Sequence, residues 1–342
     1  MNTDIIKLGD KEVILIKDYK SIYKNLKKIN NSTFGKIYKV KEIESGKLFV
    51  IKAIIVTNKK DAICVENEYD VTVAVSKGRN DIVKCYKLFA TQKKEVYYYC
   101  LLLEYIHGED LCDFLCEKNN ISHDFLPNVI FWLINVIEYL HSIGYTHRDL
   151  KIENIMIDEK NKRFVLIDFG LSTYIYKYVP KCDVCGTPMY ISPELWKMSR
   201  VVNITGDVML SSDIWAIGII LYIIITKKSP YMHSESDVIE LGKEIVEKEH
   251  FIIPIEDEKI INIVQLCLTY SYIIRPNAKN IKDIVNKYIS EPNTPLNFYT
   301  DEKNTEILEN LENLENLEKS VNLKETKNTL FKKFKNFIIE IK

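Results

Sequence analysis

The most informative part of the sequence is His147-Arg148-Asp149-Leu150-Lys151-Ile152-Glu153-Asn154. Asp168-Phe169-Gly170 begins fourteen residues after Asn154 and belongs with it. The first stretch follows a long apolar pattern of helical spacing, Leu126 to Ile143, so we expect it on a loop after a buried helix. It places a carboxylate, an ammonium group and a carboxamide close together. Phosphoryl transfer needs a carboxylate to orient and deprotonate a hydroxyl, oxygen ligands for magnesium, and a lysine to neutralise developing charge. The two motifs therefore predict phosphoryl-transfer chemistry.

The part of the chain before residue 104 is predicted to be rich in β-strands. Its apolar and polar residues alternate in short runs, which is typical of half-buried strands in an antiparallel sheet. Asp61 to Ser76 instead repeats apolar residues at helical spacing, which predicts one helix beside the sheet. The strand-like runs are Glu12–Ile16, Lys36–Val40, Leu48–Ile55, Ile82–Phe89 and Val96–Leu103.

After residue 104 the pattern becomes mainly helical. Leu126–Ile143 and Ser211–Thr226 are long apolar helical patterns, and further helices are expected after Ser236 and after Lys259. Two short β-like runs, Ile155–Ile157 and Phe164–Ile167, end in polar clusters, where functional residues often lie. From residue 291 onward, prolines and a Glu-Asn-Leu repeat predict a tail or linker outside the core.

Composition excludes several classes of protein. In 342 residues, 47 lysines and arginines against 48 acids give a formal charge of −1, so no global field attracts nucleic acid or an anionic membrane. The longest apolar run, Ala216–Ile225, is about half of what a spanning helix needs, and no signal peptide is evident. Eight cysteines without such a signal are expected to be reduced thiols. The expected location is cytoplasmic, nuclear or both.

The set of motifs resembles the eukaryotic protein kinase family of the serine/threonine type, nearest the calmodulin-dependent and SNF1-like branches. The motifs are HRDLKIEN from His147, DFG from Asp168, Ser192-Pro193-Glu194 for the usual APE, the Asp213, Trp215 and Gly218 element, and Arg275. The resemblance implies an α+β fold with two lobes, a small antiparallel sheet lobe with one helix and a larger, mainly helical lobe. It implies a kinase domain over 20–290, divided into 20–103, a hinge at 104–109, and 110–290. Residues 1–19 are an N-terminal extension and 291–342 a charged tail.

The same resemblance implies the catalytic residues and the cofactors, ATP and Mg²⁺. Asp149 is the expected base and Lys151 the group that stabilises the transferred phosphoryl. Asn154 and Asp168 are the expected magnesium ligands. Lys52 is expected to contact the nucleotide phosphates and to pair with a helix glutamate, for which Glu68 is chosen and Glu66 is the alternative.

The nucleotide-binding loop departs from the family pattern. Ile29 to Ile37 keeps only the third glycine of G-x-G-x-x-G, Gly35, while Asn30 and Ser32 occupy the first two places. Asparagine tolerates positive φ and serine is small, so a hairpin over the phosphates is still feasible, with a poorer approach of the backbone. At the hinge, Glu104 and Ile106 are expected to meet the adenine, and Asp110 completes the expected nucleotide-site residues.

The activation segment runs from Asp168 to Glu194 and suggests how the domain is controlled. Asp183 stands where related kinases carry a phosphorylatable threonine. Either its carboxylate pairs with Arg148, which predicts activation without phosphorylation and constitutive or weakly regulated activity, or it is a solvated loop residue. Thr187 matches the threonine that bridges the base and the catalytic-loop lysine. Glu153 and Asp110 predict a preference for a basic residue three places before the acceptor. The resemblance also implies that Asp213 caps the catalytic loop and that Glu194 and Arg275 form a buried ion pair. Cys182 and Cys185 form a C-x-x-C, for which a redox or metal role is the alternative to plain thiols of the segment.

The expected partners are protein substrates with serine or threonine acceptors, without nucleic acid, bound by a monomer. The tail is acidic over 301–320, with seven acids and two lysines, and basic over 324–342, with six lysines and two glutamates. Its amphipathic end suits a membrane surface, a partner or the domain itself. Two other functions remain open: a pseudokinase scaffold, and a small-molecule phosphotransferase, against which the complete activation segment argues.

Overall fold

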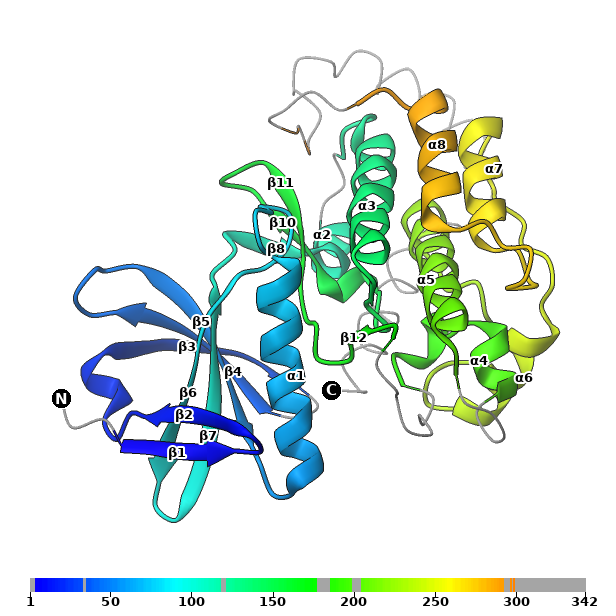
Figure 1. The fold of residues 1–342 in the computed structure, drawn as a ribbon. Helices are drawn as coiled ribbons and strands as arrows, with labels where there is room; N and C mark the ends of the chain where they lie inside the picture. Colours follow the sequence, from blue (N-terminus) through cyan, green and yellow to red (C-terminus); the bar gives the residue numbers. More distant parts are fainter. Residues whose placement is uncertain are drawn as a thin grey trace.

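The computed structural model describes residues 4–32, 35–117, 121–176, 185–198, 204–291, 296 and 298. They form two lobes, a β-sheet with one helix at the amino-terminal end and a larger, mainly helical body (Figure 1). The predicted two-lobed α+β fold is therefore confirmed. Asp183, Cys182 and the tail from 301 onward lie outside the described residues.

The amino-terminal lobe is a seven-stranded sheet in the order β1-β2-β6-β7-β5-β4-β3. Every neighbouring pair is antiparallel, as predicted, except β2 and β6, which are parallel. A 3-10 turn, Tyr19–Ser21, connects β2 to β3. The strands are β1 Asp4–Leu8, β2 Lys11–Leu15, β3 Tyr23–Ser32, β4 Gly35–Glu42, β5 Leu48–Ile55, β6 Cys85–Lys93 and β7 Val96–Glu104.

The alternation of apolar and polar residues does not predict two of the strands, β1 and β3. Strand β3 has the sequence YKNLKKINNS, whose lysines and asparagines hide the period of two. The strand predicted from Ile82 begins instead at Cys85, because Ile82 leaves this sheet and forms a bridge with Leu166 of the other lobe. This backbone bridge therefore links the segment before β6 to β11 of the helical lobe.

The single helix of this lobe, α1 (Lys59–Val75), is capped and amphipathic. The side-chain oxygen of Asn58 accepts the backbone N–H groups of Lys60 at 2.8 Å and Asp61 at 3.0 Å, which satisfies donors that a helix N-terminus leaves free. Its buried residues are Ala62, Val65, Glu68, Val71, Thr72 and Val75. The helix lies between the sheet and the helical lobe (Figure 1). Ala62 and Val65 pack in the cluster of the sheet, and Val71 and Val75 pack in the cluster that includes the helical lobe.

The carboxy-terminal lobe is built around α5, whose Trp215 is fully buried. By length and composition α5 is the one helix among the described residues that could cross a membrane, but 78% of its apolar window is buried in the lobe. Packing therefore accounts for its composition. The helices are α2 Leu111–Glu117, α3 Phe125–Ser142, α4 Pro193–Met198, α5 Gly206–Thr226, α6 Val238–Glu247, α7 Glu258–Cys267 and α8 Ala278–Tyr288.

Short strands hold the loops that carry the sequence motifs. A three-stranded sheet has the order β11-β10-β8, and a two-stranded sheet joins β9 to β12. The strands are β8 Gly108–Asp110, β9 Tyr145–Thr146, β10 Ile155–Asp158, β11 Arg163–Leu166 and β12 Thr173–Tyr174, and the 3-10 turns are Ile152–Asn154 and Pro188–Tyr190. The HRD loop thus lies between β9 and β10, and the DFG turn lies between β11 and β12.

Both ends of the domain extend beyond what the sequence pattern suggests. Phe298 is fully buried and its ring contacts Phe114, Phe125 and Phe164, at centroid distances of 6.4, 6.4 and 5.2 Å. The prediction that the chain lies outside the core from residue 291 onward is therefore wrong for this residue. At the other end, β1 and β2 lie within the residues predicted as an extension, 1–19, and belong to the main sheet.

Candidate active site

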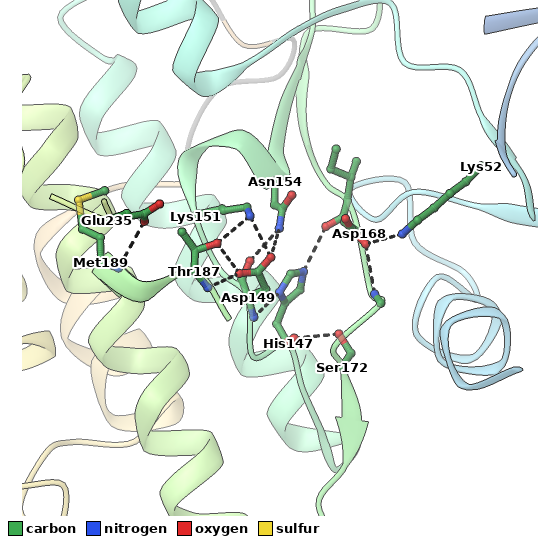
Figure 2. A network of polar contacts seen from close by, with 12 residues as sticks. Lys52, His147, Asp149, Lys151, Asn154, Asp168, Ser172, Thr187, Met189 and Glu235 are labelled. Atoms are coloured by element: carbon green, nitrogen blue, oxygen red, sulfur yellow. Dashed lines mark hydrogen bonds and ion pairs between the residues drawn. The ribbon is translucent and has the colours of Figure 1, made fainter. Parts of the chain in front are cut away.

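The carboxylate of Asp149 lies at the centre of a polar cluster on the HRD loop (Figure 2). Its Oδ1 accepts the hydroxyl of Thr187 at 2.8 Å, and its Oδ2 lies 3.0 Å from Nζ of Lys151. Lys151 Nζ also donates to the Thr187 hydroxyl at 2.7 Å. Asn154 Nδ2 donates to the Asp149 backbone carbonyl at 2.8 Å. The side chain of Asp149 is 13% exposed, so it is held in one orientation yet remains open on one side.

Asn154 and Asp168 supply oxygen ligands of the kind that hard divalent cations prefer. Because the amide nitrogen of Asn154 faces Asp149, its oxygen lies on the side toward Asp168 (Figure 2). The Asp168 side chain is 37% exposed, and the residue has a left-handed φ of 60°. A strained backbone at a non-glycine residue of this kind is common at functional sites.

Lys52 connects the two lobes at the site. Its Nζ lies 2.7 Å from Oε1 of Glu68 on α1 and 3.0 Å from Oδ1 of Asp168. Burial opposes the charged lysine, but Asp168 and Glu68 together raise the pKa of Lys52 above its ordinary value. Burial likewise opposes the charged Asp168, yet Lys52 lowers the pKa of that carboxyl to about 2. The structure thus pairs Lys52 with Glu68, the chosen residue, and the alternative Glu66 faces elsewhere.

Asp213 on α5 holds the backbone of the HRD loop through hydrogen bonds. Its two oxygens accept the backbone N–H groups of His147 and Arg148, each at 2.9 Å, which confirms the predicted capping role. The hydroxyl of Thr146 also donates to it, at 2.7 Å. Arg148 has a φ of 66°, so these bonds hold a backbone conformation that its own side chain disfavours.

His147 joins the HRD loop to the DFG turn. Its Nε2 lies 3.2 Å from the Ile167 carbonyl, and Nδ1 accepts the Asp149 N–H at 3.3 Å. Burial lowers the pKa of His147 despite the carboxylates of Asp213 and Asp149 nearby. A neutral imidazole with its proton on Nε2 satisfies both hydrogen bonds. The ring also packs edge-to-face on Phe169, at 5.0 Å between centroids.

The nucleotide-loop candidates lie on the hairpin of β3 and β4. Ile29 is 48% exposed on β3, Ile37 on β4 pairs with Lys52 of β5, and Asn30 and Ser32 pair with Ile37 and Gly35. A Cβ added to Gly35 would lie 2.2 Å from the backbone oxygen of Ala53. This close approach explains why the third glycine of the pattern is present here.

The hinge candidates also carry structural contacts. Glu104 ends β7 and its Oε1 lies 2.6 Å from Nη2 of Arg163, while Ile106 is buried. Asp110 ends β8 and its Oδ1 accepts the backbone N–H of Asp113 at 2.9 Å, which caps α2. These side chains therefore support the hinge, and β8 brings Asp110 beside β10, where it pairs with Met156.

Two polar residues near the site have no motif in the sequence. Arg163 binds both Glu104 and Asp158, so it ties the hinge to β10. Glu235 accepts the Met189 N–H at 3.4 Å beside the Asp149 cluster, and burial raises its pKa (Figure 2). Only contacts between distant segments reveal these two roles.

At the end of the activation segment, Glu194 forms the expected buried ion pair with Arg275. Arg275 Nη1 and Nη2 lie 2.7 and 3.1 Å from the two oxygens of Glu194, whose side chain is 5% exposed. The C-x-x-C pair of Cys182 and Cys185 falls outside the described residues, because Cys182 is not among them. The predicted pairing of Arg148 with Asp183 falls outside them as well.

Comparisons with known proteins agree with this geometry. The serine/threonine-protein kinase cds1 of Schizosaccharomyces pombe is 30% identical over 68% of this chain and 51% of its own length. A probable serine/threonine-protein kinase, the KIN1 homolog of Enterocytozoon bieneusi, is 28% identical over 88% of this chain and 49% of its own. The NUAK family SNF1-like kinase 2 of Rattus norvegicus is 29% identical over 61% and 31%. The chain spans about half the length, or less, of these relatives.

These relatives confirm the resemblance to serine/threonine kinases, with the SNF1-like branch among them. A family model described as the protein kinase domain matches residues 23–289, which include every motif discussed above. The chain therefore belongs to the protein kinase domain family.

Proposed function

We propose that the chain transfers the terminal phosphate of ATP to serine or threonine hydroxyls of proteins, in a reaction that depends on Mg²⁺. The observation that carries the proposal is the cluster in which Asp149, Lys151 and Thr187 contact one another. A carboxylate held beside a lysine, and open on one side, suits the orientation and deprotonation of an incoming hydroxyl. The family match supports the same activity.

Each residue of the cluster then has one role. Asp149 accepts the proton of the substrate hydroxyl, while Thr187 and Lys151 keep its carboxylate in place. Burial opposes the charge on Lys151, but Asp149 raises the pKa of the lysine, so it is a cation that stabilises the transferred phosphoryl. Lys52 is likewise charged and orients the nucleotide phosphates.

Magnesium fits the oxygen donors of Asn154 and Asp168. The depressed pKa of Asp168, about 2, keeps its carboxylate ionised at neutral pH. When bound, magnesium neutralises charge on the phosphate oxygens. Exchange of Asp168 for asparagine keeps the shape and removes the charge. We expect Asp168→Asn to abolish transfer, and isothermal titration of MgATP to report weaker binding in this variant.

The test of the whole proposal is the transfer of radiolabelled phosphate from MgATP to a degenerate serine/threonine peptide library. We expect incorporation by the full chain and a loss of at least about a hundredfold in Asp149→Asn, which keeps the size of the side chain. Thermal melting of both proteins checks that they are folded. ATP binding without transfer in the full chain would favour a pseudokinase scaffold.

A small-molecule phosphotransferase is the second alternative. The buried Glu194–Arg275 pair supports the segment that follows Thr187, and such a platform suits an extended peptide. Labelled transfer to sugars or choline, but not to the peptide library, would reverse this conclusion.

We also propose a preference for basic residues before the acceptor. Glu153 follows the catalytic loop lysine by two positions, and the carboxylate of Glu235 lies next to the same loop. Acidic groups attract arginine or lysine by charge complementarity. Asp110, the other predicted acid, caps α2. The library should therefore show enrichment of arginine or lysine, reduced in Glu235→Gln. An even distribution in the parent protein would refute the preference.

A further inference from the structure

The first two strands form a hairpin that the family model does not include. Strands β1 and β2 occupy Asp4–Leu15, whereas the family match begins at residue 23. Strand β2 adds to the sheet in parallel with β6, and the Ile16 N–H donates to the Ala90 carbonyl at 2.8 Å. In Figure 1 the turn of this hairpin lies next to α1. We call these residues, 4–16, the N-terminal hairpin.

The turn of the N-terminal hairpin binds α1 through polar contacts. Oε1 of Glu66 accepts the backbone N–H groups of Asp10 at 3.1 Å and Lys11 at 3.3 Å. One turn further along the helix, Asp70 pairs with Nζ of Lys11 at 2.7 Å. Gly9 has a φ of 55°, and a Cβ added to it would lie 2.4 Å from the same Glu66 oxygen. Glycine here allows the turn to approach the carboxylate.

An apolar cluster backs these polar contacts. Leu8, Val13 and Leu15 are 1%, 3% and 4% exposed and pack in one cluster with Ala62 and Val65 of α1. Burial of three such side chains makes the hairpin part of the lobe's core. The Tyr99 hydroxyl also donates to the Lys7 carbonyl, at 3.2 Å.

Two other residues of α1, Glu68 and Asn67, carry its contacts with the candidate active site. In a helix of 3.6 residues per turn, Glu66 and Asp70 share one face, and Glu68 points to the other side. There Glu68 pairs with Lys52, which also contacts Asp168. Next to it, Asn67 Nδ2 donates to the Ser172 carbonyl at 2.7 Å, just after the DFG turn. The helix thus contacts the N-terminal hairpin as well as the candidate active site.

We propose that the N-terminal hairpin is a built-in positioning element for α1, with Glu66 and Lys11 as its positioning residues. It keeps α1 where Glu68 reaches Lys52, and so keeps the cation that orients the nucleotide phosphates in place. The effect on transfer rests on the proposed kinase activity; the effect on the helix does not.

The first arm measures activity in the full chain. Glu66→Ala removes the acceptor of two backbone N–H groups, and α1 then spends part of its time away from Lys52. We expect kcat to fall about threefold to tenfold, in proportion to the lost population of the competent state. Glu66→Gln keeps an acceptor oxygen and should recover most of the rate.

The matched control is the ion pair between Asp4 of the hairpin and Lys17, the residue that follows the hairpin, because neither partner is on α1. Lys17 Nζ lies 2.7 Å from Oδ2 of Asp4, and both side chains are more than half exposed. Lys17→Ala should leave kcat unchanged, whereas Lys11→Ala, which breaks the pair with Asp70, should lower it. Equal effects of the two lysine variants would overturn the proposal.

A double-mutant cycle separates positioning from general stability. If Glu66 acts through Glu68, then Glu66→Ala causes no further loss of kcat in a Glu68→Ala background. If Glu66→Ala lowers kcat by the same factor in the parent and in the Glu68→Ala protein, then Glu66 acts independently of the Lys52–Glu68 pair. That result would overturn the proposal.

The second arm is hydrogen exchange and does not require activity. In Glu66→Ala, amides of α1 should exchange roughly tenfold faster, while those of α3 and α5 keep their rates. Unchanged exchange in α1 would refute the proposal even if the enzyme is active. Faster α1 exchange in a chain that transfers no phosphate would support the hairpin's role and contradict only the proposed function.

Discussion

Thr187 donates two hydrogen bonds to a single oxygen of Asp149, one from its backbone N–H at 2.9 Å and one from its hydroxyl at 2.8 Å. The same hydroxyl accepts a hydrogen bond from Lys151 at 2.7 Å. The activation segment therefore takes part in orienting the carboxylate on the catalytic loop. A disturbance of this segment is transmitted directly to the proposed base.

Replacement of Thr187 by valine tests this relationship, because valine keeps the shape and removes the hydroxyl. We expect kcat to fall roughly tenfold to a hundredfold, since a carboxylate displaced by about 1 Å loses alignment with the acceptor. The KM for ATP should change little. Steady-state kinetics on the best library peptide provide the measurement, and Thr187→Ser, which keeps the hydroxyl, should retain most of the rate. Equal losses in the two variants would contradict the hydroxyl's role.

Gly35 gives a second prediction, on nucleotide binding. A Cβ at this position would lie 2.2 Å from the Ala53 oxygen, so alanine forces β4 away from β5. The neighbouring Lys52 lies on β5 and would move with it. We expect Gly35→Ala to lower the free energy of unfolding by about 1–3 kcal/mol and to raise the KM for ATP.

Lys36→Ala is the control for this effect, because Lys36 is exposed on the same strand. It should leave both quantities nearly unchanged. Denaturant unfolding and ATP kinetics measure them. A Gly35→Ala protein with the parent's stability and KM would show that the strand contact has no consequence.

Local motifs predict the catalytic centre well for a physical reason. The groups around Asp149 lie close together in the sequence, and Asp213 and Thr187 carry their own short patterns. Most strands and helices are also found, because one face of each is buried and the apolar period shows it. The Lys52–Glu68 pair needed a choice between two glutamates, and only the geometry decides it.

The features that sequence misses depend on contacts between distant segments. Nothing in the local pattern around Phe298 shows that its ring fills a gap between three other phenylalanines. Strand β1 is short and carries its burial mainly at Leu8, so alternation is not visible. The role of Glu66 depends on a turn 55 residues away along the chain.

The pair of Glu194 and Arg275 predicts a large loss of stability. Arg275 Nη1 also donates to the Ser211 carbonyl at 2.8 Å, so one guanidinium joins α4 to α5. Glu194→Gln leaves this cation buried without its counter-charge, which should cost about 3–5 kcal/mol of unfolding free energy. Guanidinium denaturation gives the value. For comparison, Lys243→Ala breaks a pair whose side chains are 60% and 42% exposed, and should leave the free energy of unfolding nearly unchanged. Similar losses in both variants would contradict the argument.

His147 predicts a loss of stability in mild acid. Burial lowers its pKa from the ordinary value of 6.5, although Asp213, Asp149, the Ile167 carbonyl and Asp168 act in the opposite direction. Below pH 6.5 the unfolded chain takes up a proton on this side chain and the folded protein does not. The free energy of unfolding therefore decreases as the pH is lowered from 6.5 to the folded pKa, by up to about 1.4 kcal/mol for each pH unit in that window.

Heteronuclear NMR of the imidazole nitrogens checks the shift directly. We expect the His147 midpoint to lie below 6.5 and its neutral ring to carry the proton on Nε2. We also expect the melting temperature to fall more steeply with acid in the parent than in His147→Gln, which has no imidazole to titrate there. A His147 midpoint at or above 6.5 would show that the nearby carboxylates outweigh burial, and stability would then change with pH in the opposite direction.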